Sequence, residues 1–220
     1  MALQLGHPST SAMLSNHSTL RLTNSCVSVT ILCLLTACAA EDTGQSSRRD
    51  MLTTTQDEFW AALQELCGRA FPGQLIEASP PDDILAGQVL IMHVRECEDD
   101  SVRIPFHVGN DRSRTWVISR TEEGLHLKHE HNHEDGSEEE ITQYGGDALT
   151  SGSRSRQDFP ADSHTTSLVS TAANNIWGIE IRSGRTFVYS LRNGTTNRRV
   201  RLEFNLAEPI EELPPPPWGA

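Results

Sequence analysis

Aromatic residues are scarce in this chain. Phe, Trp and Tyr together make up 5% of its 220 residues. Aromatic side chains dominate the buried area of many protein cores. Their scarcity therefore predicts a core built mainly from aliphatic side chains.

Basic residues are also few. The chain has 18 Lys and Arg against 30 Asp and Glu, which gives a formal net charge of −12. Proteins that bind nucleic acid or anionic lipid headgroups through charge need a basic surface. The composition therefore argues against nucleic acid as a partner and against an electrostatic attachment to lipid.

The N-terminal region lacks an apolar run long enough to span a membrane. Its apolar stretch runs from Cys26 to Ala37 and is interrupted only by Ser and Thr. A spanning helix needs about 20 apolar residues, so twelve suit the hydrophobic region of a signal peptide instead. Arg21 precedes this stretch as a weak basic region.

The stretch ends in the letters LTAC at residues 35–38, which resemble the lipobox of bacterial lipoproteins. The resemblance implies that residues 1–37 are a cleaved signal peptide and that Cys38 carries a lipid anchor to the membrane. Ala39 after the Cys favours the outer membrane of a Gram-negative envelope, with the domain facing the periplasm. An ordinary signal peptide without a lipid, and a translation start at Met13, stay open as alternatives.

Two cysteines remain after this segment, Cys67 and Cys97. An even pair in an exported domain predicts a disulfide, with two buried thiols as the alternative. The bond would close a loop of about 30 residues and stabilise the fold by about 3 kcal/mol through chain entropy.

Residues 38–53 comprise the lipidated Cys and a polar segment without periodicity, which predicts a flexible tether. A single domain is expected over residues 54–207. Thr55 and Glu58 form a capping-box pattern, and apolar residues follow at helical spacing. This region therefore predicts one helix.

After the helix the apolar period changes to two, which predicts strands separated by short turns. The predicted strands cover residues 74–77, 88–96, 102–108, 114–120, 125–134, 138–144, 176–182, 185–192 and 199–206. Short turns join antiparallel neighbours. The expected fold class is α+β, with one N-terminal helix packed on a mostly antiparallel, meander-like sheet that curls strongly or closes into a barrel.

Two segments have weak patterns. Residues 145–173 predict a long surface loop with a short strand near 157–159. Residues 208–220 hold four consecutive prolines, which predict an extended tail. The tail is expected either to be disordered, with Trp218 against the domain, or to dock a partner protein of the envelope.

Motifs for catalysis are absent: there is no nucleophile elbow, phosphate-binding loop, zinc-protease helix or Cys-x-x-Cys pair. The stretch VRIPFHVGNDRSRTWVISRTEEGLHLKH resembles uncharacterised secreted proteins and lipoproteins of Gram-negative bacteria. That resemblance implies no activity. The sequence therefore favours a non-enzymatic binding or interaction module, and an apolar barrel interior would point to a small lipophilic ligand.

One polar segment stands out, LHLKHEHNHEDGSEEE at residues 125–140. Its Asp-Gly pair predicts a hairpin turn that pairs His133 with Glu138. Strand geometry separates alternate residues by about 7 Å, so two histidines at most share one ion, with a further ligand from elsewhere. The alternative function is thus periplasmic binding of Zn, Cu or Ni, the only cofactors expected. The candidate ligands are His129, His131, His133, Glu138 and Glu140. A solvated hairpin and a pH response remain open.

Overall fold

A computed structural model describes residues 54–81, 84–148 and 152–220 of the chain. These residues all belong to one compact unit. The signal peptide, Cys38 and the tether lie outside the described residues.

The described part of the chain forms an antiparallel sheet of eleven strands. The strands are β1 (Ala70–Ser79), β2 (Leu90–His93), β3 (Glu96–Cys97), β4 (Ser101–Val108), β5 (Asp111–Thr121), β6 (Gly124–His131), β7 (Tyr144–Asp147), β8 (Arg156–Pro160), β9 (Asn175–Arg182), β10 (Thr186–Asn193) and β11 (Arg199–Asn205). The order β7-β6-β5-β4-β2-β1-β11-β10-β9-β8 is sequential around the sheet, with β3 paired beside β4. The predicted antiparallel meander is confirmed.

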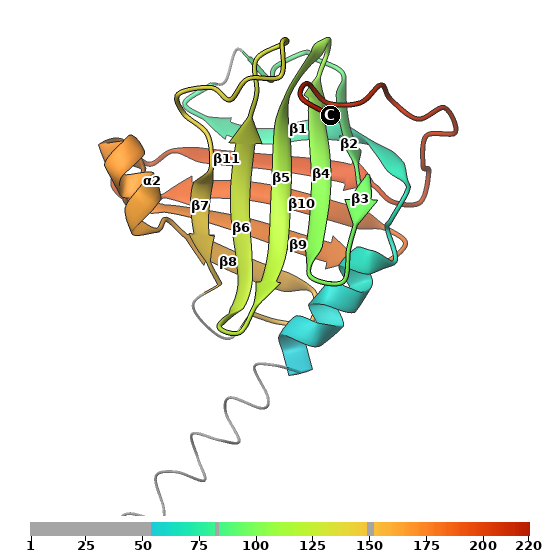
Figure 1. The fold of residues 1–220 in the computed structure, drawn as a ribbon, viewed down its shortest axis with the longest axis horizontal. Coiled ribbons are helices and arrows are strands. Elements are labelled where there is room, and N and C mark those ends of the chain that lie inside the picture. The colour runs from blue at the N-terminus through green and yellow to red at the C-terminus, as the bar shows by residue number, and fades with distance from the viewer. Residues whose placement is uncertain (1–53, 82–83, 149–151) are drawn as a thin grey trace, which may run out of the picture. The chain divides into compact units, whose positions relative to one another are not determined.

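The sheet curls into a nearly closed barrel of two crossing layers (Figure 1). β1 joins the layers because its first residues pair with β2 and its later residues pair with β11. The two edge strands, β7 and β8, meet without a ladder between them. Their approach is close, because a Cβ on Gly146 would lie 1.8 Å from the carbonyl oxygen of Pro160.

A short helix, α2 (Ser163–Leu168), closes this seam. Its Thr165 side chain accepts a hydrogen bond from the backbone N–H of Gly145 at 2.7 Å and donates one to the Gly145 carbonyl at 2.9 Å. Asp162 caps the helix through Thr165 N–H and donates its own N–H to Gly145. The Thr165 side chain and the Asp162 backbone thus bond the backbone groups of Gly145 at this sheet edge, which a neighbouring strand would otherwise bond.

Residues 54–64 are helical and lie at the β5–β6 turn end of the barrel (Figure 1). Arg120 near the end of β5 forms an ion pair with Asp57 and lies over the Trp60 ring. Thr54 and Thr55 are both helical, so Thr55 does not stand at the position before the helix that the capping-box pattern predicted for it. No helix in the described ranges is both long and apolar enough to cross a membrane.

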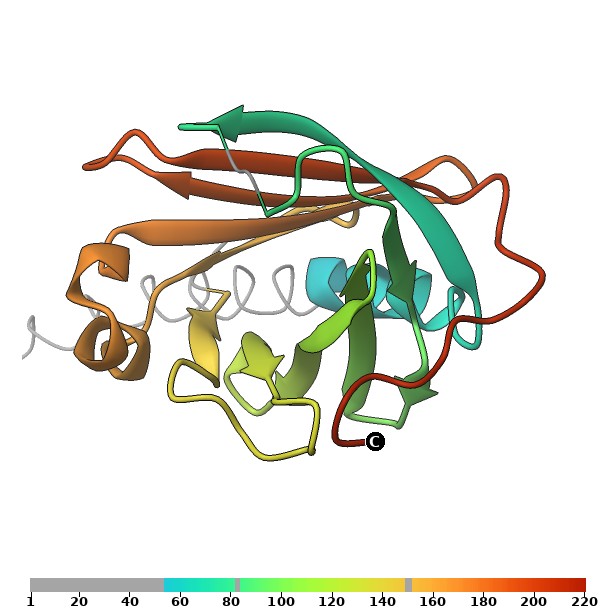
Figure 2. The same cartoon turned by 90° about the horizontal axis from the view of Figure 1, so that it is seen from above.

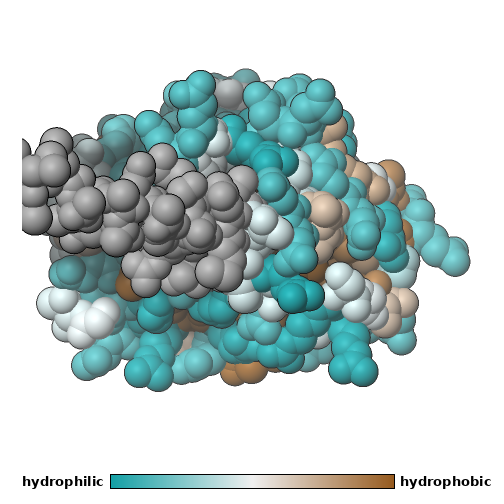
Figure 3. Space-filling model, turned by 90° about the horizontal axis from the view of Figure 1, so that it is seen from below, coloured by the Kyte–Doolittle hydropathy of each residue, from teal (hydrophilic) through white to brown (hydrophobic). Residues whose placement is uncertain are grey.

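The core is mainly non-aromatic, as the composition predicts: of the 30 buried hydrophobic residues in the described ranges, 20 are aliphatic or Met and ten are aromatic. All six Phe of the chain are buried, at most 3% exposed, together with three of its four Trp. The surface in Figure 3 is mostly hydrophilic, and hydrophobic residues occupy small separate areas of it. The aromatic residues are few, but the strands place nearly all of them inside.

Two segments differ from their predictions. Residues 138–144 were expected to form a strand, but only Tyr144 is in β7. Thr142 accepts a hydrogen bond from the His131 N–H through its side chain, and Gln143 has a φ of 58°, which interrupts extended pairing. The expected loop at 145–173 contains β8, α2 and a 3₁₀ turn (Ser170–Ala172).

The tail at 208–220 lies against the domain and is not disordered. The backbone N–H of Trp218 donates to the Arg112 carbonyl at 3.1 Å, and the Arg112 guanidinium donates to the Pro216 carbonyl at 2.9 Å. The Asn132 side chain donates to the Trp218 carbonyl. A docking role for the tail stays a prediction.

Candidate functional site

The barrel contains a cavity of about 780 Å³ at the end opposite residues 54–64. Figure 2 views the barrel from this end. Pockets for small molecules usually measure about 300–1,000 Å³ and have mainly apolar walls with a few polar groups. The apolar wall here includes Phe106, Trp116, Trp177, Tyr189, Leu191, Val200 and Leu202.

Trp116 links the two layers beside the cavity. Its ring stacks on Tyr189 of β10 with centroids 4.4 Å apart, and on Phe106 of β4 at 4.8 Å. Stacked rings of this kind contribute specific packing beyond the buried area. Sequence reasoning missed these residues, although strand alternation was a signal that could have placed them inside.

His129 is a deeply buried polar group at this wall, at 2% exposure. Its Nδ1 lies 3.0 Å from the Tyr144 carbonyl oxygen, which only accepts, so Nδ1 carries the proton. Nε2 therefore accepts a hydrogen bond from the Tyr189 hydroxyl at 2.8 Å. Burial lowers the pKa of His129 to about 3, so the ring is neutral.

A second pair extends this network toward the open end. His131 Nε2 lies 3.0 Å from the Tyr144 hydroxyl. Burial and the Arg114 charge lower the pKa of His131, and burial raises the pKa of Tyr144 to about 12. Burial also raises the pKa of Tyr189. These imidazole and phenol groups of the wall are therefore hydrogen-bonded, and burial favours their uncharged forms.

The register of the histidine hairpin corrects the expected pairing. Asn132 bridges Glu138, and His129 pairs with Tyr144. The predicted partner of Glu138 was His133. The reason is local: the turn is one residue longer than expected, since the His133 N–H donates to the Ser137 carbonyl, and residues 139–143 then leave the sheet before β7 starts.

The structure separates the five candidate metal ligands. His129 uses both ring nitrogens within the wall, His131 lies 3.7 Å from Glu139, and His133 is exposed. Glu138 accepts a hydrogen bond from Gln143, and Glu140 is exposed. In the three described ranges, no group of three or more His, Cys, Asp or Glu is arranged to hold a metal ion.

The structure also places the cysteines. Cys67 and Cys97 form a disulfide with Cα atoms 6.3 Å apart, which joins the end of the helical segment to β3. Both sulfurs lie away from the cavity wall described above. Neither is therefore a nucleophile for that site.

Comparisons of the chain with protein-family models, with curated proteins and with solved structures find no match. The function therefore has to be argued from the cavity itself.

Proposed function

We propose that the protein is a non-enzymatic binding module that holds a small lipophilic molecule inside its barrel. The cavity carries this proposal, because its volume suits a small ligand and its wall is largely aromatic and aliphatic. Two buried imidazole–phenol pairs of that wall satisfy one another, as the His129–Tyr189 bond illustrates. An apolar ligand could therefore bind without breaking the hydrogen bond between His129 and Tyr189.

The mouth of the cavity supports the same ligand class. Ile84 and Ile141 line the cavity and are 62% and 50% exposed. Large aliphatic side chains exposed beside a pocket favour the passage of apolar molecules.

Binding of a neutral fluorophore tests this function. N-phenyl-1-naphthylamine brightens in an apolar environment, so we expect its fluorescence to rise on adding the full chain. Leu191→Trp fills the cavity and should abolish the rise. Ser190→Trp, on the opposite face of the same strand, is the matched control and should retain it. No rise with the wild type, or an equal rise with Leu191→Trp, would contradict the proposal.

We also propose that the chain is exported to a Gram-negative envelope and held at the outer membrane by a lipid on Cys38. The support is the resemblance of residues 35–38 to a lipobox after a signal-peptide-like stretch. Labelling with a radioactive fatty acid in a Gram-negative host should mark the wild type and leave Cys38→Ala unmarked. Equal labelling of both chains would contradict the anchor.

A further inference from the structure

The open end of the cavity has a different chemistry from its depth. Three strands each place two inward-facing residues along the cavity wall. The deeper residue is a Trp or His, and the residue two positions nearer the open end is polar or charged. Trp116 is followed by Arg114 on β5, His129 by His131 on β6, and Trp177 by Asn175 on β9. The register sets Arg114 directly opposite His131, so these side chains form a row across adjacent strands. The wall therefore changes from apolar to polar toward the rim.

Arg198 adds a second guanidinium to this rim. It also lines the cavity. It comes directly before β11 and two residues before the inward-facing Val200. Asn193 holds its backbone, because the Asn193 N–H donates to the Arg198 carbonyl at 2.8 Å. The Asn193 side chain in turn accepts hydrogen bonds from the backbone N–H groups of Thr195 and Thr196. The hairpin that carries Arg198 is therefore ordered at the rim.

Both arginines act on the same hydroxyl. The charges of Arg114 and Arg198 each favour a lower pKa for Tyr144, and Arg198 has the same effect on Tyr189. In a chain of net charge −12, the two guanidinium groups that line this cavity with Tyr144 give its rim a cationic component that suits an anion. Guanidinium and phenol groups are both hydrogen-bond donors to carboxylates.

We propose that the ligand is an amphipathic carboxylate whose apolar body lies against Trp116 and whose head group lies at Arg198 and Arg114. This inference rests on the proposed binding function and names its ligand class. The carboxylate accepts hydrogen bonds from the guanidinium groups. The apolar chain extends into the aromatic depth of the barrel.

Three carboxylates near the rim limit the charge available. Asp111 forms an ion pair with Arg114, and Glu139, which lines the cavity, lies 3.7 Å from His131. Glu130 also lines the cavity and is paired with Arg103. Arg114 therefore shares its charge with Asp111.

Displacement of N-phenyl-1-naphthylamine by dodecanoate and by 1-dodecanol tests the ligand class. The two compounds have the same chain length and differ in the head group. We expect the wild type to bind dodecanoate at least about tenfold more tightly, because a hydrogen bond to a charged group contributes about 1.5 kcal/mol or more. Arg198→Gln should lose about tenfold for dodecanoate and keep its affinity for dodecanol. Arg114→Gln should show a loss of the same kind.

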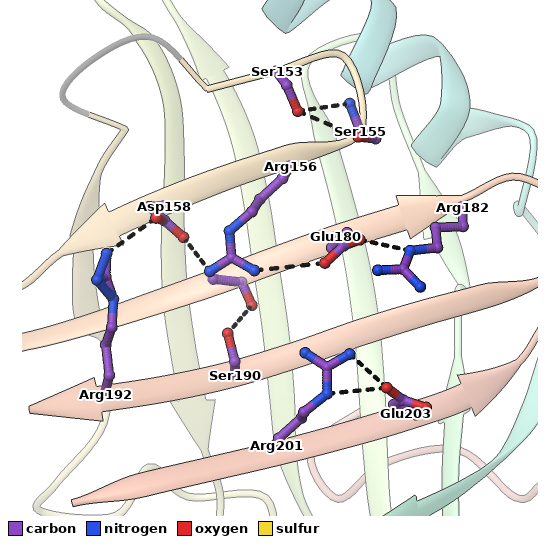
Figure 4. Close-up of polar contacts among 11 residues, drawn as sticks. Ser153, Ser155, Arg156, Asp158, Glu180, Arg182, Ser190, Arg192, Arg201 and Glu203 are labelled. Carbon is purple, nitrogen blue, oxygen red and sulfur yellow. Dashed lines mark hydrogen bonds and ion pairs between the residues drawn. The ribbon is translucent and has the colours of Figure 1, made fainter. Parts of the chain in front are cut away.

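Arg201→Gln is the matched control. Arg201 is paired with Glu203 on the outer face of β11 (Figure 4), so its loss lowers the net charge equally but away from the cavity. Equal affinity for the acid and the alcohol would overturn the ligand class and leave the binding function standing. If the fluorophore does not bind at all, both the ligand class and the binding function would be overturned. A preference for dodecanoate that survives in both cavity variants, or falls equally in Arg201→Gln, would overturn the assigned site.

Discussion

The two faces of the back layer, β8 to β11, carry polar groups of different kinds. On the outer face, Arg156 lies between Asp158 and Glu180, and Arg192 reaches Asp158 from β10 (Figure 4). On the inner face, the Tyr189 hydroxyl bonds a neutral imidazole. The cost of removing a charge from water explains the difference, because it is several kcal/mol for a buried ion and small for a half-exposed one.

Packing and complete hydrogen bonding therefore stabilise the inner face, whereas water solvates the charged groups of the outer face. A change on the inner face should cost stability that salt does not alter. A change of similar size on the outer face should cost little.

The largest effect is expected at Phe187, which is fully buried between Phe204 and Trp116. Phe187→Ala removes a ring and leaves a space that the barrel fills only partly. We expect the free energy of unfolding to fall by about 3–5 kcal/mol. Urea denaturation followed by circular dichroism measures it. A loss under about 1 kcal/mol would show that this part of the interior is loosely packed.

A pH-dependent effect is expected at His129, whose pKa in the fold is about 3. Between pH 6.5 and 3 the unfolded chain takes up a proton there that the folded protein does not, so stability is lost as the pH falls through this window. Between pH 7.5 and pH 5, this one group lowers the free energy of unfolding by about 2 kcal/mol.

His129→Gln removes this contribution. The variant should be less stable than the wild type at pH 7.5, and the difference should narrow by about 2 kcal/mol at pH 5. Thermal or urea unfolding at the two pH values measures it. Burial also lowers the pKa of His107, to about 4, so the variant keeps part of the acid sensitivity. Parallel stability curves would show that His129 is charged in the fold or does not titrate there.

Neighbouring residues on β10 give a smaller and more direct comparison. Tyr189→Phe leaves His129 Nε2 buried without a donor and should cost about 1.5 kcal/mol. Ser190→Ala removes a hydroxyl on the outer face that donates to the Gly178 carbonyl at 3.3 Å. That loss should be within about 0.5 kcal/mol. Equal losses in urea denaturation would contradict the proposed difference between the faces.

The sequence predicted most strands because alternation of apolar and polar residues marks a half-buried strand directly. It did not show where the few aromatic residues gather, because composition counts them without showing where they lie. Trp116 and Tyr189 are 73 residues apart in the chain, and their contact depends on how the two layers of the barrel meet. A long-range contact of that kind has no local signal.

The histidine hairpin shows the same limit within a shorter segment. The Asp-Gly pair located the turn, since the His133 N–H bonds the Ser137 carbonyl across it. It did not fix the register, which changes when residues 139–143 leave the sheet. That change brings Tyr144 opposite His129 and turns an expected hydrophilic ladder into part of the cavity wall. The position of a turn is thus easier to predict than the pairing beyond it.

The smallest effect is expected on the outer face at Asp158, which holds Arg156 and Arg192 with about one third of its side chain exposed. Asp158→Asn keeps the shape of the side chain and removes its charge. Exposed ion pairs contribute about 0–1 kcal/mol, and salt screens them. The loss in urea denaturation should therefore stay below about 1 kcal/mol at low salt and shrink further in about 1 M NaCl. A larger loss that salt leaves unchanged would mean that these charges are desolvated, and the two faces of the layer would then be stabilised in the same way.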